Sequence, residues 1–141
     1  MPTTRPVMLI AGAGPGMGRS TAVLAAERGM DLVLVARSAE SLSETAGQVR
    51  AKGADVLAVP ADLTLPASAQ LVVDRTLEHF GRLDVLVHSL LPPHLLKRVL
   101  ALEESDLETW RHSVEVSTFG ALGRLDRLNG PPLKSRADSH L

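Results

Sequence analysis

Apolar runs of strand length alternate along the chain with longer stretches in which apolar residues recur every three or four positions. The strand-like runs cover residues 7–11, 31–36, 55–59 and 83–88. The stretches with helical periodicity cover residues 19–29, 39–52 and 66–80. Continuous apolar strands separated by helices are typical of a parallel sheet with helices on both faces, because the crossovers are right-handed. The pattern predicts a doubly wound α/β fold with strand order 3-2-1-4.

Residues with known preferences for helix ends support these elements. Gly53 and Gly81 follow the second and third helical stretches, and glycine is common just past a helix end. Thr64 and Pro66 stand at the start of the third stretch, where a cap and a first-turn proline are expected.

A glycine-rich segment joins the first strand to the first helix. Gly12, Gly16 and Gly18 form a Gly-x-x-x-Gly-x-Gly pattern, with Gly14 inside it. The commoner Gly-x-Gly-x-x-Gly pattern would require glycine where Met17 stands. A strand that turns directly into a helix needs positions without side chains, and the N–H groups at the helix start then face an anion. The segment predicts a diphosphate site, with a glycine-rich turn that holds no ligand as the alternative.

The predicted strand order places a ligand crevice where the first and fourth strands part. The glycine segment and the pair His88 and Ser89, which ends the fourth strand, would flank this crevice. His88 is a candidate hydrogen-bonding group there, and a structural histidine is the alternative.

The last third of the chain has a different pattern. Residues 90–100 contain Pro92 and Pro93 and are expected to form a loop. Ser105 and Glu108 make a capping box for a longer helix, whose apolar positions 107, 110, 114, 119 and 122 can face the sheet. Residues 123–141 are polar and interrupted by Gly-Pro-Pro, which predicts a disordered tail. The expected division is therefore one α/β domain over residues 1–122 and a tail over residues 123–141.

Composition excludes several classes of function. The chain has 141 residues, no cysteine and a formal net charge of −1, so thiolate chemistry is absent and charge gives no reason to expect nucleic acid or a membrane as partner. The five histidines do not have the spacing of a metal site. The N-terminal apolar stretch is too short for a signal peptide or membrane span, so a cytoplasmic protein is expected.

With these residues in place, the chain resembles the N-terminal half of the short-chain dehydrogenase/reductase family, single-domain Rossmann proteins that use NAD or NADP. The resemblance runs from about residue 7 to residue 122. It rests on the glycine segment, Asp62 with Leu63, the fourth strand, and Trp110 with Glu115 and Val116. These last three lie in the helix expected after residue 105, which resembles the family's fifth helix and is called the fifth helix below. It implies that Asp62 and Leu63 hold the adenine ring. The residues expected to bind the cofactor are Gly12, Gly14, Gly16, Met17, Gly18, Arg37, Ser38, Asp62, Leu63, His88 and Ser89.

The end of the second strand indicates which cofactor is preferred. An NAD site usually carries an acidic residue there, whose carboxylate would repel a 2′-phosphate. This chain has Arg37 and Ser38, a guanidinium and a hydroxyl that can both bind a phosphate. We therefore expect NADP in preference to NAD, with a solvated surface arginine as the alternative.

The chain departs from the family where the chemistry takes place. His88-Ser89-Leu90-Leu91 stands in place of Asn-Asn-Ala-Gly, and its leucines would crowd the cofactor. Ser117 occupies the position of the family's catalytic asparagine. The family's later serine and its Tyr-x-x-x-Lys pair have no counterpart, and the chain contains no tyrosine.

Three hypotheses follow. The first is a C-terminally truncated member that keeps most of the dinucleotide half-site and has no activity alone. The second is a pseudoenzyme that senses NADP(H), or pairs with a copy of itself or a full-length relative through the fourth strand and fifth helix. The third is an enzyme completed by another chain.

Overall fold

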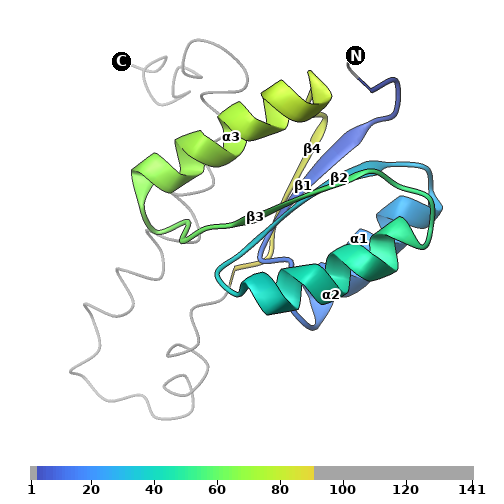
Figure 1. Ribbon diagram of the computed structural model, residues 1–141, viewed down its shortest axis with the longest axis horizontal. Coiled ribbons are helices and arrows are strands. Elements are labelled where there is room, and N and C mark those ends of the chain that lie inside the picture. Colours follow the sequence, from blue (N-terminus) through green and yellow to red (C-terminus); the bar gives the residue numbers. More distant parts are fainter. Residues whose placement is uncertain (1–2, 91–141) are drawn as a thin grey trace, which may run out of the picture.

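The computed structural model describes residues 3–90, which form a parallel sheet of four strands in the order β3-β2-β1-β4. Helices alternate with the strands, so the predicted fold class and strand order are confirmed (Figure 1). The elements in chain order are β1 (Val7–Ala11), α1 (Met17–Glu27), β2 (Asp31–Ala36), α2 (Ala39–Arg50), β3 (Val56–Pro60), α3 (Pro66–Phe80) and β4 (Val85–His88). The predicted loop over 90–100, apart from Leu90, lies outside the described residues, and so do the predicted fifth helix and the tail.

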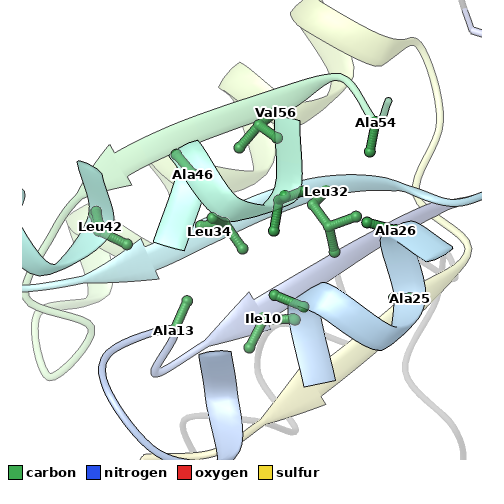
Figure 2. Packing of buried hydrophobic residues seen from close by; sticks show 12 residues of the cluster. Ile10, Ala13, Ala25, Ala26, Leu32, Leu34, Leu42, Ala46, Ala54 and Val56 are labelled. Atoms are coloured by element: carbon green, nitrogen blue, oxygen red, sulfur yellow. The ribbon is translucent and has the colours of Figure 1, made fainter. Parts of the chain in front are cut away.

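Helices α1 and α2 lie on one face of the sheet and α3 lies on the other (Figure 1). Side chains alternate between the two faces along each strand. In β1, Ile10 belongs to the apolar cluster under α1 and α2, whereas Leu9 belongs to the cluster under α3. Figure 2 shows the first cluster, in which aliphatic side chains of β2 meet alanines of both helices. Small side chains on the helices let them approach the sheet closely.

The helix ends agree with the prediction in part. Gly81 ends α3 with φ 73° and Gly53 follows α2 with φ 82°, both in the left-handed region that glycine favours. Thr64 lies near the start of α3 as predicted, but Leu65 holds the cap position and no side chain caps the helix. The Thr64 hydroxyl instead donates to Asp62 Oδ1 over 2.7 Å.

The first helix begins two residues earlier than predicted, at Met17. It therefore starts inside the glycine segment, since glycine permits the turn and the close approach that an early start requires. Strand β4 begins at Val85, later than the predicted residue 83, because the Asp84 carboxylate accepts a hydrogen bond from Val7 N (2.8 Å) at the entry to the sheet.

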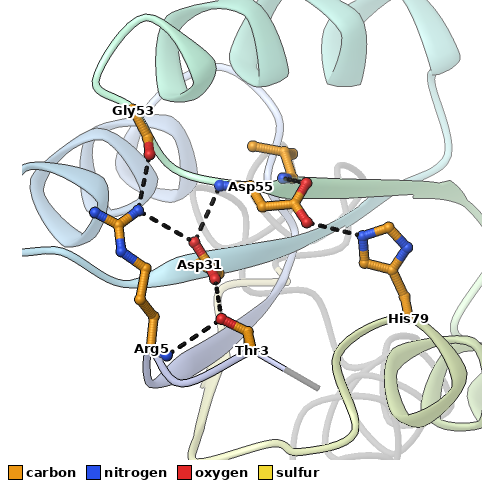
Figure 3. A network of polar contacts seen from close by, with 7 residues as sticks. Thr3, Arg5, Asp31, Gly53, Asp55 and His79 are labelled. Carbon is orange, nitrogen blue, oxygen red and sulfur yellow. Dashed lines mark hydrogen bonds and ion pairs between the residues drawn. The ribbon is translucent and has the colours of Figure 1, made fainter. Parts of the chain in front are cut away.

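A polar network joins the elements at the amino ends of the strands (Figure 3). Asp31 is 2% exposed and accepts hydrogen bonds from Thr3 Oγ1 (2.7 Å) and Asp55 N (3.0 Å). Arg5 donates to Gly53 O (2.8 Å), and its Nη1 is 3.5 Å from Asp31 Oδ1. The network ties the chain before β1 to the start of β2 and β3, and leaves the opposite edge of the sheet to the glycine segment.

Candidate functional site

The carboxyl ends of three neighbouring strands stand side by side. Ala11, the last residue of β1, is in register with Val35 of β2 and with His88 of β4. Because the strands are parallel, the segments that follow them all emerge at this edge of the sheet. Strand β1 lies between β2 and β4, so the glycine segment that follows it is at the point where the strand order reverses, which is where ligands bind in open α/β sheets.

Gly12 brings the glycine segment against the end of β4. Its φ is 95°, and a Cβ at this position would be 2.4 Å from the carbonyl oxygen of Ser89. Gly12 N and Ala13 N both donate to Val35 O, over 2.8 and 3.0 Å. A side chain is therefore excluded at Gly12 on two grounds, backbone conformation and space.

Two further glycines shape the start of α1. Gly18 lies in the first turn, where a Cβ would collide with the Gly12 carbonyl oxygen at 2.0 Å. Gly16 holds the cap position with φ 101°, and no side chain caps the helix. The first N–H groups of a helix have no partners within the helix, so those of α1 are available to an anion. The predicted glycine pattern thus has a separate physical reason at each of its three positions.

The other two residues predicted in this segment are less constrained. Gly14 has no positive φ, and a Cβ there would make only an ordinary contact of 3.7 Å with Ser41 Oγ. Met17 is 79% exposed and begins the helix. Neither requires its residue type for the fold of the described residues.

Arg37 and Ser38 form the corner between β2 and α2. Ser38 is the cap of α2, and its Oγ accepts a hydrogen bond from Ser41 N over 3.2 Å. The side chain predicted to bind a phosphate therefore also has a structural role. Arg37 is exposed beside it, which leaves a guanidinium at the carboxyl edge of the sheet.

Asp62 and Leu63 follow β3 at the same edge. Ala61 N donates to Ala36 O over 3.0 Å, which keeps the end of β3 beside the Arg37 corner. The Asp62 carboxylate accepts hydrogen bonds from the Thr64 hydroxyl and the Thr64 N–H, and these, with the nearby positive charge of Arg37, lower the pKa of Asp62. Leu63 is 9% exposed and packs in the cluster under α3.

His88 and Ser89 approach the glycine segment from β4. Ser89 N donates to Ala11 O over 2.7 Å, which extends the pairing of the two strands by one residue beyond His88. His88 is half-buried. Leu90 is partly buried against the cluster under α3, and Leu91 lies outside the described residues. The structure thus brings all eleven predicted cofactor residues to the carboxyl edge of one sheet.

Thr45 and Arg19 also contribute to this edge, although the sequence did not single them out. Thr45 is fully buried, and its Oγ1 is 3.1 Å from Ala13 O and 3.0 Å from Arg19 Nε. The sequence does indicate that Thr45 is buried, because it shares a helix face with the apolar residues Leu42, Ala46 and Val49. A buried hydroxyl needs hydrogen-bond partners, which could have marked Thr45 as a residue of interest.

Ser117, which the family resemblance aligns with a catalytic asparagine, lies outside the described residues. Within residues 3–90, no three side chains of the metal-binding types come together. None of the helices in this part of the chain is long and apolar enough to span a membrane.

Comparison with known proteins agrees with this architecture. The sequence model of the family described as short chain dehydrogenase matches residues 6–126. The 11-beta-hydroxysteroid dehydrogenase A of Sesamum indicum is 39% identical over 115 residues, which are 81% of this chain and 32% of that protein. The chain thus spans about a third of the length of this relative.

Solved structures give the same answer. A short chain dehydrogenase/reductase from Burkholderia phymatum in complex with NAD is 39% identical, with a TM-score of 0.56 over 58% of this chain and 29% of that one. An actinorhodin polyketide ketoreductase variant with NADPH shares the fold, with a TM-score of 0.74 over 91% of this chain and 48% of that one, at 24% identity. The chain belongs to the short-chain dehydrogenase/reductase family.

Proposed function

We propose that this chain binds NADP(H) at the carboxyl edge of its sheet, with the diphosphate at the start of α1. The observation that carries the proposal is that no side chain caps the start of this helix at Gly16. The segment before the helix lies close to Ser89, because Gly12 has no side chain to separate them. A diphosphate would accept hydrogen bonds from the free N–H groups and would be favoured by the helix dipole. A side chain at Gly12 or Gly18 would displace the backbone that presents them.

The adenosine half would lie over the ends of β2 and β3. In this proposal Arg37 and Ser38 bind the 2′-phosphate of NADP, because a guanidinium and a hydroxyl are both suited to a phosphate. Asp62 and Leu63 would border the adenine ring, as the family resemblance implies. The proteins of similar fold include one with NAD and one with NADPH, so the preference for NADP rests on Arg37.

We further propose that these 141 residues bind the dinucleotide without reducing a carbonyl substrate by themselves. The family delivers a proton from a tyrosine beside a lysine, and the sequence contains no tyrosine. When bound, the cofactor would supply the hydride. The described residues would hold its phosphates and adenosine.

Calorimetric titration of the purified chain with NADPH, beside a Gly12→Val variant, tests the site. Val at Gly12 would meet Ser89 O, so we expect saturable binding by the wild-type chain and none by a variant that is still folded by circular dichroism. Equal binding by the two proteins would place the nucleotide elsewhere. Absence of binding by the wild-type chain would reject the proposed function.

A further inference from the structure

The hydroxyl of Thr45 touches both arms of the glycine segment. Its Oγ1 is 3.1 Å from the carbonyl oxygen of Ala13, on the strand side of the segment, and 3.2 Å from Ser41 O in its own helix. Arg19 Nε, on the helix side, donates to the same oxygen over 3.0 Å. Ala13 and Arg19 enclose the five residues of the segment that would face the diphosphate.

The burial of Thr45 makes these contacts consequential. The residue has 0% exposure, and Ala13 packs with Leu42 and Ala46 on the same side of the sheet (Figure 2). A hydroxyl has one hydrogen to donate and lone pairs that accept. The Thr45 hydroxyl accepts from Arg19 Nε and shares its one hydrogen between Ala13 O and Ser41 O. It therefore links the two arms, and its loss would leave the buried Ala13 carbonyl and the Arg19 guanidinium without this partner.

Arg19 extends the link to the outside of α2. Its Nη2 is 2.8 Å from Glu44 Oε2, and its side chain is 23% exposed. The guanidinium therefore spans from an exposed carboxylate to a buried hydroxyl, which fixes the first turn of α1 against α2. Because α2 begins at the Ser38 cap, the same helix carries the corner proposed to bind the 2′-phosphate.

We propose that Thr45 is a positioning residue for the dinucleotide, which sets the spacing between Ala13 and Arg19 so that the N–H groups of α1 meet the diphosphate. It acts through the backbone of the glycine segment and does not touch the ligand. This inference rests on the proposed function. It goes further, because it assigns the geometry of the diphosphate site to a side chain of the following helix.

Two ligands separate positioning from general stability. NADPH requires both the 2′-phosphate corner and the diphosphate site, whereas 2′-AMP carries the 2′-phosphate but no diphosphate. Thr45→Val keeps the shape of the side chain and removes the hydroxyl. We expect the affinity of Thr45→Val for NADPH to fall about tenfold. Its affinity for 2′-AMP should stay within about twofold of the wild type. Thr45→Ser, which keeps a hydroxyl, should restore NADPH binding.

Thr76→Val is the matched control. Thr76 is also fully buried in a helix, but its hydroxyl donates to Val72 O of its own helix, α3, on the other face of the sheet. We expect it to leave both affinities unchanged. If Thr45→Val does not fold, Arg19→Met removes the other half of the link at a partly exposed position and should give the same selective loss.

The outcomes separate failure of the nucleotide site from failure of the positioning role of Thr45. Wild-type protein that binds neither ligand would reject the proposed function, and the inference with it. Wild-type protein that binds both, with a Thr45→Val variant that loses both to the same extent or neither, would overturn the positioning role alone. Loss of NADPH affinity that Thr45→Ser fails to restore would also overturn it.

Discussion

The carbonyl oxygen of Ser89 lies so close to the α-carbon of Gly12 that a Cβ there would be 2.4 Å from it. The contact joins the segment after β4 to the segment after β1, the two sides of the crevice predicted from the strand order. A side chain added at Gly12 would therefore disturb both segments at once.

We expect Gly12→Ala to lower the free energy of unfolding by about 2–5 kcal/mol, from the left-handed backbone and the collision with Ser89 O together. Urea unfolding followed by circular dichroism measures this. Gly47→Ala provides the contrast, because a Cβ there meets nothing within 4 Å and the position is in the exposed face of α2. It should raise the free energy of unfolding by about 0.5–1 kcal/mol. A Gly12→Ala protein as stable as the wild type would contradict the described contact.

Asp31 should govern stability without governing nucleotide binding. Its buried carboxylate accepts from the Thr3 hydroxyl with one oxygen and from Asp55 N with the other, and an asparagine there would replace one of these oxygens by an NH₂ donor. We expect Asp31→Asn to lower the free energy of unfolding by about 1–3 kcal/mol.

The same variant should keep its NADPH affinity. Asp31 begins β2 and Arg37 follows its end, so roughly 20 Å of strand separates them. Calorimetry on the folded variant checks this, and a large loss of affinity would mean that the two edges of the sheet are coupled.

Asp84 should make stability depend on acid pH. Hydrogen bonds from Arg82 and from Val7 N lower the pKa of Asp84 in the folded protein. The unfolded state therefore binds the proton more readily, and the contribution of Asp84 to stability is complete above the unfolded pKa of about 3.9 and lost as the pH falls through the lower folded pKa.

Urea unfolding between about pH 6 and about pH 3, a range that includes the ordinary pKa of an aspartate, tests this assignment. Asp84→Asn should lose less stability over the range than the wild-type protein does. Parallel curves for Asp84→Asn and the wild type would assign the pH dependence to other groups.

The sequence predicted the sheet because its signals are local. Runs such as 32–36 are apolar throughout, as strands covered on both faces must be, and Gly53 and Gly81 mark helix ends through backbone conformation alone. The glycine segment was predicted for the same reason. The start of α1 was predicted two residues too late, because glycines such as Gly16 and Gly18 have poor helix propensity. The observed start depends on tertiary packing of Gly18 against Gly12 O.

The contacts at the site were less accessible from the sequence. Thr64 has the residue type of a helix cap, and whether its hydroxyl bonds the helix or Asp62 depends on the turn that follows β3. Thr45 and Arg19 are 26 residues apart, and nothing local indicates that a hydroxyl of α2 meets a guanidinium of α1. Such pairs depend on how helices pack, which periodicity alone does not specify.

The role of Arg37 in selecting NADP can be measured as the ratio of NADPH to NADH affinity. This ratio is compared between wild-type protein, Arg37→Glu and the charge-matched control Arg75→Glu on α3. We expect wild-type protein and Arg75→Glu to prefer NADPH by at least about tenfold, and Arg37→Glu to lose or reverse the preference while it still binds NADH. An unchanged ratio in Arg37→Glu would show that Arg37 does not select the cofactor.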